Sequence, residues 1–112
     1  MNHTIKILPL AAALFGAGVS TAWAADPAKG KEKADQVCAA CHGKDGATPI
    51  DPSYPKLAGQ HADYLLQALT AYKNDSRKNA IMGAQAKTLS KADMQNLAAY
   101  YGSLPGPLSH RR

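Results

Sequence analysis

Two cysteines and a histidine lie close together in the segment Cys38-Ala39-Ala40-Cys41-His42. Two thiols three positions apart can each form a thioether bond with one vinyl group of a porphyrin, and a histidine that follows at once then lies beneath the iron as an axial ligand. This is the spacing at which haem is attached covalently. The segment therefore predicts one haem c held by Cys38 and Cys41, with His42 as an iron ligand, in a chain that transfers electrons.

Three other interpretations of the two cysteines fit the residues less well. A thioredoxin-like redox dithiol expects a strand before the motif and a βαβ environment, which the surrounding sequence lacks. A structural zinc site needs four ligands, and His61 and His110 are badly placed beside a single thiol pair. A disulfide across so short a loop would add little stability. Haem attachment is the interpretation that we favour.

The N-terminus has the pattern of an export signal. Lys6 precedes an apolar run over residues 7–19, and Ala22-Trp23-Ala24 supplies small residues on both sides of a cleavage-site position. This pattern predicts a secretory signal over residues 1–24 that is removed. The run is shorter than the roughly 20 residues that span a bilayer, so an uncleaved membrane anchor is the weaker alternative.

Removing residues 1–24 leaves enough chain for one domain, which we place at residues 25–104. The mature chain keeps 12 basic and 8 acidic residues, a formal charge of about +4. This charge favours steering towards an acidic protein partner, and no basic patch interleaved with aromatic residues suggests nucleic-acid binding. Five tyrosines are the only aromatic residues left, so a buried haem would have to supply part of the core. We therefore expect the haem-free chain to be largely disordered or molten.

The apolar periodicity predicts an all-α domain. Helices are expected over residues 27–38 and 61–72 and from Ser90 onwards, where Ser90 and Asp93 have the spacing of a cap and Met94, Leu97 and Tyr101 share one face. The segment 43–53 is rich in turn-forming residues and is expected to be a loop. Residues 105–112 are expected to be a flexible basic tail.

Several pieces of the sequence together resemble the class I cytochromes c, in particular the small single-haem periplasmic members from bacteria. These pieces are Gly30, the haem motif, Pro55-Lys56-Leu57-Ala58-Gly59, a late Met82, and a following helix with Leu97 and Tyr100. The segment 54–60 is similar to the repeat unit of the two-haem cytochromes of the c-four type. Because this sequence has one haem motif, it resembles one half of such a protein.

The resemblance implies about four helices around one haem and a role for each matching residue. His42 would bind iron through one ring nitrogen while the other donates to the carbonyl of Pro55, and Met82 would be the second axial ligand. Met94 and His61 are weaker candidates for that position. Leu57, Gly59 and Tyr64 would also contact the haem. Gly30 would let the first helix cross the last one closely near Leu97 and Tyr100, although Ala34 stands where the family usually has an aromatic residue.

The function implied is that of a monomeric, periplasmic single-electron carrier and not of an enzyme, since two axial ligands leave iron no open position for a substrate. Its partners would be redox proteins with acidic docking surfaces. Two alternatives stay open: a haem subunit of a periplasmic oxidoreductase, and an open-site haem protein that binds a ligand. Candidates for a basic rim around the haem edge are Lys44, Lys56, Lys73, Arg77, Lys78 and Lys87.

Overall fold

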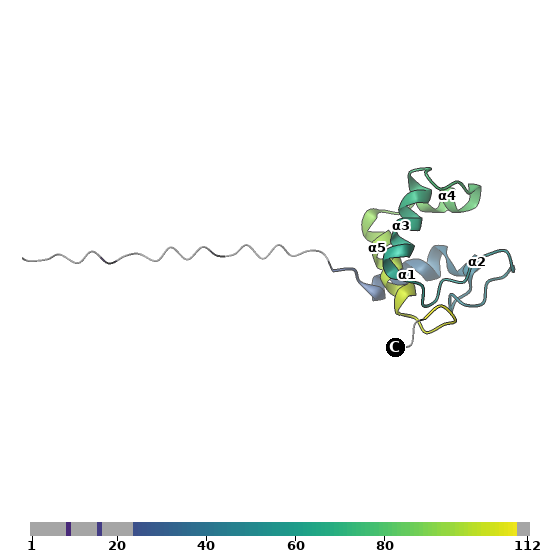
Figure 1. Ribbon diagram of the computed structural model, residues 1–112, viewed down its shortest axis with the longest axis horizontal. Helices are drawn as coiled ribbons and strands as arrows, with labels where there is room; N and C mark the ends of the chain where they lie inside the picture. Colours follow the sequence, from purple (N-terminus) through teal and green to yellow (C-terminus); the bar gives the residue numbers. More distant parts are fainter. Residues whose placement is uncertain (1–8, 10–15, 17–23, 110–112) are drawn as a thin grey trace, which may run out of the picture.

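The structure is a computed structural model that describes residues 9, 16 and 24–109. Between residues 24 and 109 the chain forms helices and no strand, which confirms the all-α prediction. The helices are α1 (Pro27–Val37), α2 (Ala39–His42), α3 (Ala62–Lys73), α4 (Ala80–Lys87) and α5 (Lys91–Ser103), as Figure 1 shows. Most of the predicted secretory signal, residues 1–8, 10–15 and 17–23, lies outside the described residues, as does His110.

Helices α1 and α5 begin at side chains that accept hydrogen bonds from their first N–H groups. The Asp26 carboxylate accepts hydrogen bonds from the N–H groups of Ala28 (2.9 Å) and Lys29 (3.3 Å) at the start of α1. At the start of α5, the Ser90 hydroxyl accepts from the N–H of Asp93, and the Asp93 carboxylate accepts from the N–H of Ser90, each at 3.0 Å. These two bonds form the predicted cap. The helices predicted over residues 27–38 and 61–72 are found within one residue of those limits.

Two short helices are additions to the three ranges predicted from periodicity. α2 is a single turn inside the Cys38–His42 motif, which is too short to have a periodic pattern. α4 contains Gly83, a weak helix former, and has little amphipathic character. Its one clear signal is Asn79, whose side chain accepts hydrogen bonds from the N–H groups of Ile81 (3.0 Å) and Met82 (2.9 Å).

The first and last long helices cross at Gly30. A Cβ atom on Gly30 would lie 2.0 Å from the carbonyl oxygen of Asn96 and 2.7 Å from Cβ of Tyr100. Only glycine allows the two backbones to approach this closely. The crossing expected of Gly30 is therefore present, with Asn96 and Tyr100 as its nearest neighbours on α5.

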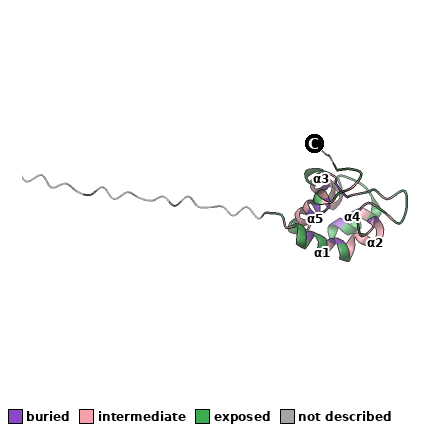
Figure 2. Ribbon diagram, turned by 90° about the horizontal axis from the view of Figure 1, so that it is seen from below, coloured by how far each residue is buried: buried purple, intermediate pink, exposed green. Residues whose placement is uncertain are grey.

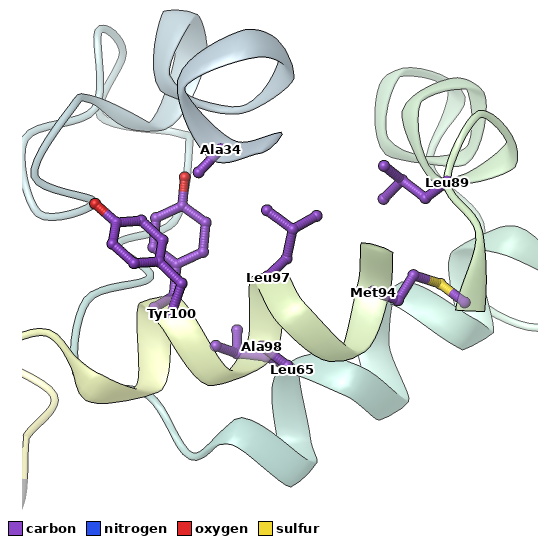
Figure 3. Close-up of a cluster of buried hydrophobic side chains, with 8 residues drawn as sticks. Ala34, Leu65, Leu89, Met94, Leu97, Ala98 and Tyr100 are labelled. Atoms are coloured by element: carbon purple, nitrogen blue, oxygen red, sulfur yellow. The ribbon is translucent and has the colours of Figure 1, made fainter. Parts of the chain in front are cut away.

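The apolar core lies between α1, α3 and α5. Figure 3 shows Ala34 of α1 near Leu97 and Tyr100 of α5, with Met94 further along the same helix beside Leu89. The small side chain of Ala34 is buried at this contact. Most of α1 is exposed (Figure 2), and Gly30 and Ala34 are its buried residues. Leu97 is the only large side chain of the described residues that is less than 2% exposed.

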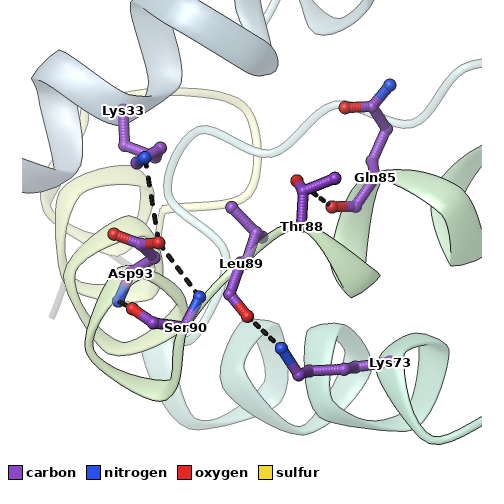
Figure 4. A network of polar contacts seen from close by, with 7 residues as sticks. All are labelled: Lys33, Lys73, Gln85, Thr88, Leu89, Ser90 and Asp93. Carbon is purple, nitrogen blue, oxygen red and sulfur yellow. Dashed lines mark hydrogen bonds and ion pairs between the residues drawn. The ribbon is translucent and has the colours of Figure 1, made fainter.

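Polar contacts tie the linker between α4 and α5 to the neighbouring helices (Figure 4). The Lys73 ammonium at the end of α3 donates to the carbonyl oxygen of Leu89. The Lys33 ammonium of α1 lies 3.8 Å from the Asp93 carboxylate at the start of α5. These contacts fix the position at which α5 begins.

Residues 105–109, the first part of the expected tail, form a turn against the loop that precedes α3. The N–H of Ser109 donates to the carbonyl oxygen of Gly106 at 3.0 Å. A Cβ on Gly106 would lie 2.7 Å from the carbonyl oxygen of Ala58, and a Cβ on Gly59 would lie 2.5 Å from the nitrogen of Ser109. This segment therefore packs on the domain, and the domain limit at residue 104 stays a prediction.

Candidate haem site

The two cysteines occupy the junction between α1 and the short α2. The N–H of Cys38 donates to the carbonyl oxygen of Ala34 as α1 ends, and the N–H of His42 donates to the carbonyl oxygen of Cys38 at 3.0 Å. Both thiols are free and half-buried, and both residues line one cavity together with His42. One turn of helix thus presents two thiols and an imidazole to the same space.

The orientation of His42 is fixed by the loop around Pro55. Its ring is only 6% exposed, and Nδ1 lies 2.9 Å from the carbonyl oxygen of Pro55. A carbonyl oxygen only accepts, so Nδ1 carries the proton and donates, and the lone pair of the neutral ring is on Nε2. A metal ligand needs a free lone pair on one nitrogen and an anchored second nitrogen.

Pro55 is held in place by the neighbouring turn. The carbonyl oxygen of Gly46 accepts hydrogen bonds from the N–H groups of Leu57 (2.7 Å) and Ala58 (3.0 Å). Gly46 has φ +65, and a Cβ there would lie 2.9 Å from the ring of Tyr101. The glycine therefore allows the 43–46 turn and the 55–58 segment to close over His42 against α5.

The cavity has a volume of about 310 Å³ and reaches from the cysteine motif to α4. Met82, half-buried on α4, lines it, as does His42. Most of the remaining wall is apolar, with side chains from α1, α3, α4 and α5 and from the loops between helices: Val37, Leu57, Leu65, Leu69, Ile81, Leu89 and Leu97. Two thiols, an imidazole with a free Nε2, a thioether and apolar walls are the groups that a covalently attached haem requires. The residues present therefore fit this cofactor.

Burial raises the pKa of the Cys38 thiol to about 11, and the negative charge of Cys41 opposes ionisation further, although a hydrogen bond from Tyr101 acts in the other direction. Burial also raises the pKa of the Tyr101 hydroxyl above its ordinary value. A redox dithiol would need a lowered cysteine pKa. The arrangement thus disfavours the thioredoxin-like alternative. No group of three or more His, Cys, Asp or Glu side chains suited to a metal ion is found among the described residues.

Leu57 and Tyr64, both predicted from the resemblance, line the cavity, but Gly59 does not. Gly59 has φ +82, its N–H donates to the carbonyl oxygen of Tyr101 at 2.9 Å, and Ser109 covers it. Gly59 is thus a turn position that joins the loop to α5, and its contact with the haem stays a prediction.

The two rival ligands lie elsewhere. His61 borders a separate depression beside Ser109 and the end of α5 and does not line the cavity. Met94 is 4% exposed and belongs to the apolar core between the helices. Of the methionines in the described residues, Met82 alone lines the cavity.

Sequence reasoning missed several polar residues of the cavity wall. Asn79 and Gln85 belong to α4 and its cap, and both line the cavity with Met82. The spacing of Gln85, three positions after Met82, would have placed it on the same helical face if α4 had been recognised.

None of the helices in the described part of the chain has both the length and the apolar character needed to cross a bilayer.

The fold and the cavity define a small all-helical protein built around a covalently bound haem. A family model described as cytochrome c matches residues 27–105. The chain belongs to the cytochrome c family. It carries one haem c attached through Cys38 and Cys41, with His42 completing the motif.

This chain is similar to relatives of about its own length and to relatives of about twice its length. Cytochrome c-554(548) of Halomonas halodenitrificans is 43% identical over 83 residues, which are 71% of this chain and 98% of the relative. The reduced recombinant cytochrome c4 of Pseudomonas stutzeri has a similar fold, with a TM-score of 0.68 and 39% identity over 74% of this chain and 47% of that one. The chain spans about half the length of the cytochrome c4 relatives that it matches. The resemblance to one half of a c-four-type cytochrome is thereby confirmed.

A third relative is named for its redox partner. A thiosulfate dehydrogenase electron acceptor of Thiomonas intermedia is 36% identical over 104 residues, which are 93% of this chain and 45% of that protein. The relatives are bacterial electron-transfer proteins, and this chain is a haem electron-transfer protein of the same family.

Proposed function

We propose that this chain is a periplasmic single-electron carrier in which His42 and Met82 are the axial ligands of one haem c. The observation that carries the proposal is that both residues line one apolar cavity. The N–H at Nδ1 of His42 donates to the carbonyl oxygen of Pro55, so the lone pair of Nε2 is available to bind iron. The predicted secretory signal over residues 1–24 and the bacterial relatives support a periplasmic location.

The bound haem supplies one-electron chemistry between ferric and ferrous iron. The Pro55 carbonyl holds the imidazole of His42 in one tautomer and one orientation. Met82 follows the Asn79 cap, which accepts its N–H at 2.9 Å and fixes the start of α4. A soft thioether at Met82 favours the reduced state relative to a second histidine. With both axial positions filled by the protein, the site has no place for a substrate, which fits a carrier better than an enzyme.

The proposed partners are redox proteins with acidic docking surfaces. The chain itself is proposed to be mostly monomeric. The name of the Thiomonas relative supports an oxidoreductase as one such partner. Within the basic rim, Lys44, Lys56 and Lys78 are exposed, whereas Lys87 is 2.5 Å from the Asp75 carboxylate and Lys73 donates to Leu89. Steering by this rim would make the rate of electron transfer fall as ionic strength rises.

The second candidate function is a permanent haem subunit of a periplasmic oxidoreductase. It is favoured by the same relative and by the half-length match to two-haem proteins. Purification of the chain from the periplasm distinguishes the two. A free carrier elutes at the size of a single chain, and a subunit elutes with its partner.

Carbon monoxide binding to the reduced protein tests the ligand assignment. We expect no binding to the native protein, because Met82 occupies the sixth position, and binding to Met82→Ala without denaturation. Met94→Leu is the matched control, since it replaces a core methionine at nearly constant volume. Binding of carbon monoxide to the native protein would show an open site and would support the ligand-binding alternative instead.

A further inference from the structure

The cavity that receives the haem has an uneven distribution of charge. Among the described residues that line it, Lys56 and Arg77 carry positive charge, and none is Asp or Glu. A haem brings two propionate carboxylates into a space whose walls are mainly apolar. A carboxylate taken from water into such a space requires hydrogen-bond donors or a cation to compensate its lost hydration.

Arg77 is held in place from both ends of α3. Its backbone N–H donates to the carbonyl oxygen of Ala71 at 3.0 Å, just after the helix ends. Its guanidinium Nη1 donates to the Tyr64 hydroxyl at 3.3 Å, near the start of the same helix. The guanidinium carbon also lies 4.9 Å from the ring centroid of Tyr72. All three side chains line the cavity.

This arrangement orders a side chain that would otherwise be mobile. An arginine side chain loses rotamer entropy when it is immobilised. Here the contacts with Tyr64 and Tyr72 immobilise Arg77 before an anion binds, so less entropy is lost on binding. The Tyr64 hydroxyl uses one of the five N–H donors of the guanidinium. The planar guanidinium can pair with a carboxylate through two parallel hydrogen bonds, whereas the ammonium of Lys56 is a point charge on a flexible stem.

We propose that Arg77, positioned by Tyr64 and Tyr72, binds a propionate carboxylate of the haem and thereby raises the reduction potential of the site. The proposal rests on the covalent haem and does not depend on Met82 as a ligand. A fixed positive charge beside the cofactor compensates the propionate and disfavours the additional positive charge of ferric iron.

The test is a redox titration of the holoprotein and its variants. Arg77→Gln removes the positive charge and the planar guanidinium. We expect the equilibrium between ferrous and ferric haem to shift towards ferric iron by about three- to tenfold. Lys78→Gln is the matched control. Lys78 is the next residue, is exposed as Arg77 is, and carries the same charge, but it does not line the cavity. We expect it to shift the equilibrium by less than about twofold. Arg77→Lys should recover most of the native potential.

A second variant keeps the test decisive if Arg77→Gln accumulates poorly. Tyr64→Phe keeps the ring and every formal charge but removes the hydrogen bond to the guanidinium. We expect a smaller shift in the same direction. An unchanged potential in Tyr64→Phe would contradict the positioning role of Tyr64. Equal shifts in Arg77→Gln and Lys78→Gln, or none in either, would overturn the proposal, because Arg77 would then act as one more surface charge.

Discussion

Glycine at position 30 lets α1 and α5 touch through their backbones. A methyl group there would lie 2.0 Å from a carbonyl oxygen of Asn96, and a helix backbone cannot yield as a flexible side chain can. We expect Gly30→Ala to lower the free energy of unfolding of the holoprotein by about 1–3 kcal/mol, measured by chemical denaturation.

Gly83 supplies the control for this substitution. It also lies within a helix, but a Cβ there would have its nearest neighbour at 3.9 Å. Gly83→Ala is expected to raise the free energy of unfolding by about 0.5–1 kcal/mol, because alanine loses less backbone entropy in a helix than glycine does. Equal effects of the two substitutions would contradict the close crossing at Gly30.

At the scale of the helix, α5 depends on its N-terminal cap. Ser90→Ala removes the hydroxyl that accepts the N–H of Asp93, and we expect a loss of about 1 kcal/mol in the free energy of unfolding. Ser103→Ala is the control, since the Ser103 hydroxyl only donates to a carbonyl of its own last turn. An equally large loss of unfolding free energy in Ser103→Ala would contradict a specific stabilising role of the Ser90 cap.

The same cap gives α5 a dependence on acid. Hydrogen bonding from the Ser90 N–H is the main factor that holds the pKa of the Asp93 carboxyl below its ordinary value, with Lys33 assisting. The stability that follows is present above the ordinary pKa and is lost as pH falls through the lowered one. Asp93→Asn should therefore be less stable than the native protein at neutral pH, and the difference should shrink in acid. A difference that grows in acid would contradict this sign.

At the scale of the whole molecule, folding and haem attachment are expected to be coupled. The cavity walls are mainly apolar, and Leu97 is the one large described side chain that is less than 2% exposed. The double variant Cys38→Ser, Cys41→Ser cannot form thioethers. We expect its far-ultraviolet circular dichroism to show a large loss of helix and its thermal transition to broaden. A cooperative, native-like transition in this variant would contradict the coupling.

The residues with the strongest local signals could be predicted from the sequence. The Cys38–His42 spacing predicts the haem and the Ser90–Asp93 pair predicts a helix start, because both depend on residues close together in the chain. Gly30 predicts a close helix crossing because it lacks a Cβ atom. The resemblance added Pro55, whose hydrogen bond to His42 is present at 2.9 Å. Met82 and Tyr64 line the cavity as expected, and their roles at the haem stay predictions.

Other features depend on tertiary contacts that local patterns do not encode. α4 has weak propensity and is placed by the Asn79 cap and the Asp75–Lys87 ion pair. Gly59 belongs to a family motif, but its location beneath Ser109 follows from the packing of the C-terminal turn. The cluster of Arg77 with both tyrosines depends on the turn after α3, where Asp75 has φ 65.

The assignment of His42 and Met82 as the axial ligands is tested most directly by the near-infrared absorption spectrum of the oxidised holoprotein. We expect the weak band that reports sulfur-to-iron ligation, which should vanish in Met82→Ala and persist in Met94→Leu. Absence of the band in the native protein, with the spectrum of a five-coordinate or two-histidine haem, would contradict the assignment.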